Sequence, residues 1–176
     1  MPHVHDQLRK IDLVELSNSA APELLAQARE LLLEYGRFVI SHPAAAQFCF
    51  GTLEKEAARL PASYQEQGGG ALVGLMHQSV VGFIAWRRPP GEFAAEAWEL
   101  KRLWVRPQAR GTGLGRTLTQ AVLDRAAASG RKAVYLDTVP EAMPAAHKLY
   151  LDMGFKPCPA YGDNPMPGLA YLRKDL

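Results

Sequence analysis

A cluster of glycines at residues 110–116, Arg-Gly-Thr-Gly-Leu-Gly-Arg, constrains the fold of this chain more than any other feature. It follows the segment 97–105, which predicts a strand, and it opens a segment whose apolar residues recur at helical spacing. The first backbone N–H groups of a helix have no intrahelical partner, and glycines leave them uncovered and permit positive φ. With Arg110 and Arg116 on either side, the cluster predicts a turn that binds a diphosphate.

The cluster has three other interpretations. A dinucleotide-binding fold needs glycine where this chain has Arg116, and it places the glycines after the first strand, although Asp137 lies at about the distance of a ribose-binding acid. The pattern also lacks the Gly-Lys-Ser/Thr ending of a nucleoside-triphosphate loop. Finally, three glycines can simply make a tight turn, an interpretation that the flanking arginines and the strongly periodic helix disfavour.

The rest of the chain alternates between strand and helix patterns. We expect helices from Pro22 to before Gly36, from about Pro43 to Pro61, over 114–130 and over 144–153. We expect strands over 8–16, 71–76, 80–86, 97–105 and 133–137, around Phe155 and over 168–173, with 71–86 forming a hairpin. Residues 157–167 contain four prolines and predict an irregular loop. This order indicates an α/β or α+β fold with a mixed sheet.

Composition excludes several classes of protein. The 176 residues suit one domain, and a formal charge of +2 without a basic patch argues against a nucleic-acid partner. The two cysteines, Cys49 and Cys158, have neither disulfide-framework nor zinc spacing, so we expect no metal. No signal peptide or membrane-length apolar run is visible, so we expect a cytoplasmic protein without a membrane partner.

Residues 99–155 resemble the GCN5-related N-acetyltransferase (GNAT) superfamily in two motifs. Arg110-Gly111-Thr112-Gly113-Leu114-Gly115 is similar to its pyrophosphate loop, Arg/Gln-x-x-Gly-x-Gly/Ala, and 149–155 is similar to its Leu-Tyr-x-x-x-Gly-Phe signature. The resemblance implies a mixed, mostly antiparallel sheet of six to seven strands with about four helices. It implies a single domain over 1–176, in which 1–95 shape the acceptor site and 96–176 bind acetyl-CoA.

The same resemblance implies an enzyme that transfers the acetyl group of acetyl-CoA to a primary amine of a small molecule, or of a protein, by direct attack in a ternary complex. Leu103, Trp104 and Val105 would pair along the pantetheine arm, with an oxyanion-binding N–H near Val105. The pyrophosphate would contact Arg110, Gly111, Thr112, Gly113, Leu114, Gly115 and Arg116. The chain lacks the family's asparagine after the fifth strand, so Thr138 or a main-chain group would take its place.

Two residues are candidates for catalysis. Tyr150 maps onto the tyrosine that protonates the departing thiolate, although its helical spacing with Met143, Ala146 and Met153 also suits a core residue. Glu99 is the candidate base, acting through a water, because strand alternation places it on one face with Lys101, Leu103 and Val105. The alternative for Glu99 is an exposed carboxylate paired with Lys101 or Arg102.

The acceptor is not identified by any motif. Glu54 and Glu56 either line an acceptor pocket or form a solvated helix face, and residues 161–165 either overhang the acceptor site or form a rigid connector. A catalytically inactive acetyl-CoA sensor or partner module is the main alternative to an enzyme, and a homodimer is one oligomeric state that the sequence allows.

Overall fold

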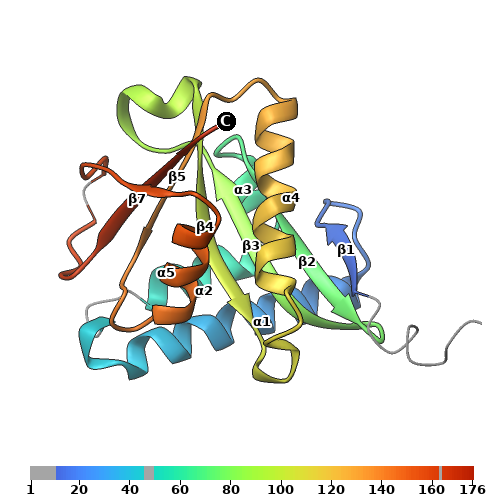
Figure 1. The fold of residues 1–176 in the computed structure, drawn as a ribbon. Coiled ribbons are helices and arrows are strands. Elements are labelled where there is room, and N and C mark those ends of the chain that lie inside the picture. Colours follow the sequence, from blue (N-terminus) through green and yellow to red (C-terminus); the bar gives the residue numbers. More distant parts are fainter. Residues whose placement is uncertain (1–10, 46–49, 163) are drawn as a thin grey trace, which may run out of the picture.

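The computed structural model describes residues 11–45, 50–162 and 164–176, and its centre is a twisted sheet of seven strands with helices on both faces (Figure 1). The strand order is β1-β2-β3-β4-β5-β7-β6. Only β4 and β5 pair in parallel, and the other neighbours are antiparallel. The expected mostly antiparallel mixed sheet is therefore confirmed. The strands are β1 (Ile11–Glu15), β2 (Gly70–Met76), β3 (Ser79–Arg87), β4 (Ala97–Val105), β5 (Ala133–Thr138), β6 (Lys156–Pro157) and β7 (Ala170–Asp175).

The helices form two layers, one on each face of the sheet. One layer contains α4 (Leu114–Ala128) and α5 (Pro144–Asp152), which pack with Ile84, Trp86 and Leu100 of the sheet. The other contains α1 (Pro22–Ser41), α2 (Phe50–Ala58) and the short α3 (Ala62–Gln65), which pack on the alternate residues of the same strands. None of the helices in the described ranges combines the length and apolar character needed to cross a membrane.

The predicted hairpin is confirmed as β2 and β3. Its turn consists of His77 and Gln78, because Met76 pairs with Ser79. Both turn residues have positive φ, 50° and 64°. This conformation suits a two-residue hairpin, since its twist matches that of the flanking strands.

Two helix boundaries differ from the sequence expectation. Helix α1 continues through Gly36 to Ser41, because Gly36 and Val39 are buried, and this packing outweighs the low helix propensity of glycine. Residues Pro43–Ala45 form only a 3-10 turn, and the following helix is described from Phe50. The part of the first expected strand at 8–10 lies outside the described residues.

A bulge in β4 overturns the expectation that Glu99, Lys101, Leu103 and Val105 share a face. Ala85 pairs with Lys101 and Phe83 pairs with Trp104, so two residues of β4 oppose the single Ile84. The extra residue reverses the alternation. Leu103 and Val105 therefore pack in the core under α4, whereas Trp104 packs in the core under α1.

A pair of glycines positions the first turn of α4. Gly74 of β2 and Gly82 of β3 pair directly across the hairpin. A Cβ at either position would lie 2.7 Å from a methyl carbon of Leu114, the first residue of α4, and one at Gly82 would also lie 2.9 Å from Leu118. The two glycines thus leave the space into which the helix packs, and they fix its distance from the sheet.

We expect Gly82→Ala to lower the free energy of unfolding by about 1–3 kcal/mol, because the added methyl overpacks against two buried leucines. Chemical denaturation measures this loss. Gly51→Ala is the matched control, since Gly51 lies in α2 and an added Cβ there would meet only open space. A Gly82→Ala protein as stable as the parent would contradict the close packing of α4 on the hairpin.

Candidate active site

Two adjoining clefts lie where β4 and β5 separate. The two strands pair only over 97–99 and 133–135 and have no further ladder between them. The first cleft, of about 690 Å³, runs from the end of β4 to the first turns of α4 and α5. Its lining includes the predicted residues Leu103, Trp104, Val105, Arg110, Gly111, Gly113, Leu114, Gly115 and Arg116.

The first turn of α4 presents bare backbone donors to this cleft. Gly111 and Gly113 have φ of 76° and 83°, which only glycine adopts without strain, and a Cβ at either would meet nothing within 4 Å. In the described chain, the N–H groups of 111–116 donate no backbone hydrogen bond. Unpaired N–H groups and the positive end of the helix dipole together favour an anion here. The residues present therefore fit a diphosphate.

Two arginines flank this turn and differ in their contacts. Arg116 is exposed and has no ion-pair partner among the described residues. Arg110 donates from Nε to the Val105 carbonyl at 3.0 Å, and its guanidinium lies 4.9 Å from the centre of the Trp104 ring. Phe38 of α1 packs against the same ring, with 4.9 Å between ring centres. These contacts hold the side chains of one wall of the first cleft in place.

Two predicted cofactor residues do not line this cleft. The Thr112 hydroxyl donates to the Ala109 carbonyl at 2.7 Å and stabilises the turn from inside. Thr138, expected to replace the missing asparagine, lines the second cleft instead, because it lies at the end of β5 beyond the point where the strands separate. The backbone N–H of Thr112 still belongs to the unpaired set.

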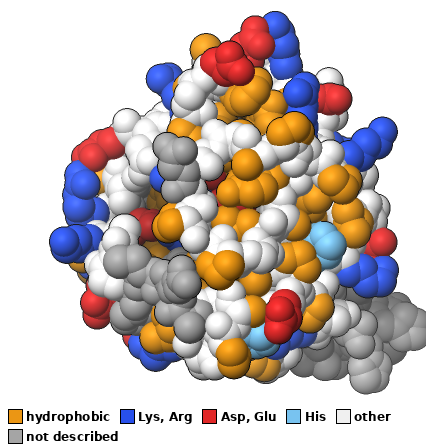
Figure 2. All heavy atoms as spheres, turned by 90° about the vertical axis from the view of Figure 1, so that its left-hand side faces the viewer, with side chains coloured by type: hydrophobic (Ala, Val, Ile, Leu, Met, Phe, Trp, Pro, Cys, Tyr) orange, Lys and Arg blue, Asp and Glu red, His pale blue; other side chains and the backbone are white. Residues whose placement is uncertain are grey.

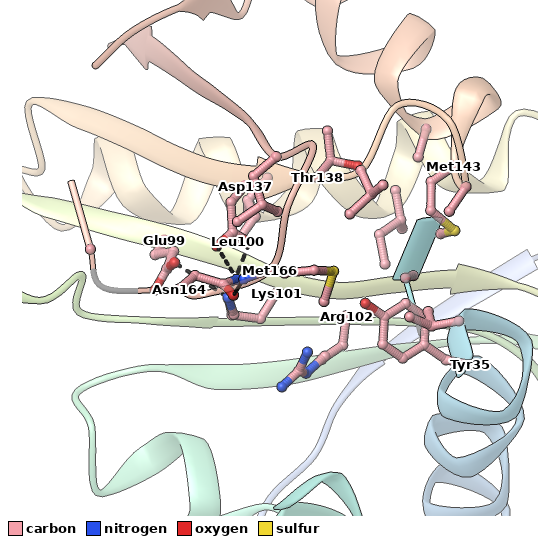
Figure 3. A pocket seen from close by; sticks show the side chains of 18 of the residues that line it. Tyr35, Glu99, Leu100, Lys101, Arg102, Asp137, Thr138, Met143, Asn164 and Met166 are labelled. Carbon is pink, nitrogen blue, oxygen red and sulfur yellow. Dashed lines mark hydrogen bonds and ion pairs between the residues drawn. The ribbon is translucent and has the colours of Figure 1, made fainter. Parts of the chain in front are cut away.

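The second cleft, of about 500 Å³, lies between the ends of β4 and β5, α1 and the C-terminal loop (Figure 3). One wall is apolar and includes Val39, Val139, Met166 and Leu169. The loop residues Tyr161, Gly162, Asn164, Pro165 and Met166 line it as well. The loop therefore overhangs this cleft and is not merely a connector. Figure 2 shows hydrophobic side chains gathered across the middle of one face of the molecule, with charged side chains around its edge.

Lys101 holds two carboxylates together on the floor of the second cleft. Its ammonium lies 3.4 Å from Glu99 and 3.3 Å from Asp137 (Figure 3). Burial alone would raise the pKa of Asp137, but the Lys101 charge and hydrogen bonds from Asn164 and Lys101 outweigh it and hold the pKa below its usual value. Asp137 therefore stays ionised near neutral pH.

Glu99 is buried, with an exposed fraction of 2%, so the alternative of an exposed carboxylate is wrong, although the pairing with Lys101 that it included is present. Its oxygens accept from Arg87 Nε at 2.9 Å, from Lys101 and from the Tyr161 hydroxyl at 3.0 Å. Burial, Glu99 and Asp137 raise the pKa of Tyr161 well above its ordinary value, so the phenol stays protonated. Arg102, the other expected partner of Glu99, bonds to Glu56 instead.

Tyr150 lies on α5, is 6% exposed and lines the second cleft. Its ring packs edge-on against Phe155, with 5.7 Å between ring centres. Burial, and then the nearby Tyr35 and Asp137, raise the pKa of Tyr150 above its ordinary value, so the hydroxyl holds its proton. The ring belongs to the core and the residue also lines the cleft, so the two interpretations of its spacing are compatible.

The two clefts share Leu103, Ala142, Met143 and Ala146. A group held in the first cleft and a group held in the second can therefore meet beside Leu103, at the β4 bulge. This arrangement suits transfer between two substrates bound at the same time.

Sequence reasoning missed several residues of the second cleft. Asp137 entered only as a ribose-binding alternative, and Tyr35, Arg87 and Asn164 were not singled out. Their positions depend on long-range packing, and only the polar residues of the 161–165 loop gave a local signal. Glu56 is largely buried and paired with Arg102, whereas Glu54 is exposed, so the solvated-face interpretation holds for Glu54 alone.

The acetyltransferase (GNAT) family model matches residues 23–155. An uncharacterized N-acetyltransferase of Schizosaccharomyces pombe is 37% identical over 78 residues, which are 44% of this chain and 47% of the relative. The N-acetylaspartate synthetase of Danio rerio is 28% identical over 139 residues, 78% of this chain and 48% of the relative. The chain thus spans about half the length of these curated relatives.

Solved structures agree with the family match. An acetyltransferase from Streptococcus agalactiae superposes with a TM-score of 0.74 at 25% identity, covering 94% of this chain and 98% of that one. The fold is also that of a Thermoplasma acidophilum N-acetyltransferase solved in complex with coenzyme A, with a TM-score of 0.72 at 17% identity over 95% of this chain and 99% of the other. The chain belongs to the acetyltransferase (GNAT) family.

Gly113→Ala tests the turn at the start of α4. The change places a side chain at φ 83° and disturbs the exposed N–H groups, so we expect CoA to bind about tenfold more weakly, the loss of one hydrogen bond to a charged group. Titration calorimetry measures the dissociation constant.

Gly130→Ala is the matched control, because Gly130 has φ 75°, follows the opposite end of α4 and also has open space around it. Both variants lose about 1–2 kcal/mol of stability from the strained backbone. Equal CoA affinity in the two variants would contradict an anion site at this turn.

Proposed function

We propose that this protein is an acetyl-CoA-dependent N-acetyltransferase that acetylates the amine of a small molecule bound in the second cleft. The observation that carries the proposal is the meeting of the two clefts at Leu103, with the bare N–H groups of α4 at the far end of the first. Acetyl-CoA supplies an acetyl group activated as a thioester. The family match and the fold shared with a CoA-bound acetyltransferase support this assignment.

The first cleft would bind the donor along its length. The N–H groups of 111–116 and the Arg116 guanidinium would contact the pyrophosphate, and the end of β4 at 103–105 would contact the pantetheine arm. A backbone N–H near Val105 would stabilise the negative charge that develops on the acyl oxygen, since a donor fixed in advance needs no reorganisation during the reaction.

The second cleft supports a zwitterionic acceptor such as an amino acid. Its lining contains two carboxylates, Glu99 and Asp137, and the two cations paired with them, Arg87 and Lys101. An ammonium group and a carboxylate on one small acceptor would both find opposite charge there. The overhanging loop favours a small molecule over a protein, and the name of the Danio rerio relative makes aspartate the first acceptor to test.

Glu99 is the proposed base, and Tyr161 is proposed to pass the amine proton to it. An alkyl amine is mostly protonated at neutral pH and must lose a proton before it attacks. Because the Tyr161 hydroxyl donates to Glu99, it can take the amine proton as it passes its own proton to the carboxylate. Tyr150, which holds its proton, is proposed to protonate the departing thiolate.

Release of free thiol from acetyl-CoA, measured over a panel of amines, tests the function. We expect turnover with at least one small zwitterionic amine, with aspartate compared against its side-chain amide, a simple diamine and an unstructured peptide. CoA binding with no turnover over the whole panel would favour the inactive sensor. Turnover with the peptide alone would contradict the small-molecule acceptor.

Tyr150→Phe removes the proposed proton donor and keeps the ring packing. We expect kcat to fall about 10²–10⁴-fold, the usual contribution of general acid catalysis, with an unchanged dissociation constant for CoA. Tyr135→Phe is the control, because Tyr135 is buried in β5 and lines neither cleft.

The pH profile of the parent protein gives a second check on Tyr150. Since its folded-state pKa lies above the ordinary value of about 10, the protonated donor persists below that pH and is lost only on more alkaline titration. Full activity in Tyr150→Phe would remove this residue from the mechanism.

A further inference from the structure

Arg102 has an unusual backbone for a residue in the middle of a strand. Its φ is 62°, in the left-handed region, which carries a cost for any residue except glycine. It is the residue at which β4 changes its register with β3. An interaction of the side chain must therefore offset the cost of this conformation.

The Arg102 side chain is tied to the helices on the acceptor side of the sheet. Its Nε and Nη2 donate to the two carboxylate oxygens of Glu56 in α2 at 3.2 and 3.1 Å, and both side chains are largely buried, with 16% and 15% exposed. Glu56 also accepts from the Tyr64 hydroxyl of α3. The guanidinium lies 5.8 Å from the centre of the Tyr35 ring of α1. Four elements thus meet at the Arg102–Glu56 ion pair.

The Arg102 side chain extends away from the charged residues on the floor of the second cleft. In Figure 3, the Arg102 side chain extends downward, away from the group formed by Glu99, Lys101 and Asp137, and Tyr35 lies to its right. Its two hydrogen bonds to Glu56 use the Nε and Nη2 edge of the guanidinium, one of the two edges that can bind an anion in bidentate fashion. The Arg102–Glu56 ion pair thus links β4 to α2, and it is called the brace below.

We propose that the Arg102–Glu56 ion pair is a positioning device that fixes the backbone of the β4 bulge and thereby aims the residues at 103–105. Leu103, the second residue of the bulge, lines both clefts, so a rotation at Arg102 displaces the place where the two substrates meet. The inference rests on the proposed acetyl transfer. It adds a residue pair that affects the reaction rate without touching either substrate.

Two substitutions at Arg102 distinguish bracing from substrate binding. Arg102→Ala keeps a strained residue at positive φ and removes the ion pair, so we expect kcat to fall about 100-fold, the effect of a small misplacement of reacting groups. Arg102→Gly also removes the ion pair but adopts positive φ freely, and we expect it to recover most of the lost kcat. A direct role in binding the acceptor predicts instead that both variants are equally impaired, through KM.

Glu56→Gln removes the charge of the partner with little change in shape, and we expect a tenfold loss of kcat with CoA affinity within twofold of the parent. The matched control is Glu34→Gln. Glu34 of α1 forms a similar multiple contact with Arg106, at 2.7–3.1 Å, just beyond the end of β4, and neither residue lines a cleft. We expect it to leave kcat within twofold. Equal losses in the two variants would overturn the proposal.

Backbone amide NMR spectra test the conformation of β4 without a measurement of turnover. In Glu56→Gln and Arg102→Ala, but not in Glu34→Gln, we expect the backbone signals of 102–105 to shift in the absence of any ligand. Unshifted signals would refute the brace even if activity changed. If the parent protein turns over no amine, the proposed function fails, whereas the brace is still judged from these signals.

Discussion

The separation of β4 from β5 beyond Glu99 creates the gap onto which both clefts open. The two parallel strands share hydrogen bonds over three residues each and then part, so the backbone groups of β4 beyond Glu99 have no neighbouring strand on that side. Backbone donors and acceptors that lose a strand partner need another partner. Both clefts open onto this gap, and a ladder continued to Val105 would close them. The opening in the sheet is thus a requirement for any reaction at this place.

Two local features border the gap between β4 and β5, one on each face of the sheet. On one face, the Gly74 and Gly82 pair lets Leu114 pack close to the sheet, which brings the first turn of α4 to the end of β4. On the other face, α1, α2 and α3 meet the bulge through Arg102 and Glu56. The first cleft therefore depends on apolar packing and bare backbone, whereas the second cleft depends on buried charge.

Most of the fold could be predicted from the sequence because its signals are local. A local periodicity marks each of three segments: the hairpin at 71–86, the strand at 97–105 and the helix after the glycines. The resemblance to the GNAT superfamily predicted the mixed, mostly antiparallel sheet. The bulge was not predicted, because the charged pair Lys101-Arg102 lies in a segment that otherwise resembles one continuous strand and no glycine announces the positive φ. Missing the bulge placed Leu103 and Val105 on the wrong face. Tyr161 and Asn164, which bond to Glu99 and Asp137, come from a loop more than 20 residues away, and such pairings depend on long-range packing, which spacing does not give.

The most direct test of the account is an amide-detected titration of the labelled protein with CoA, with NAD as a second diphosphate. The account predicts that CoA shifts the signals of 111–116 together with those of 103–105, because one ligand would contact both the turn and the strand end. NAD, which has no pantetheine arm, should leave 103–105 unchanged. Saturating CoA that left both groups of signals in place would contradict the assignment of the first cleft.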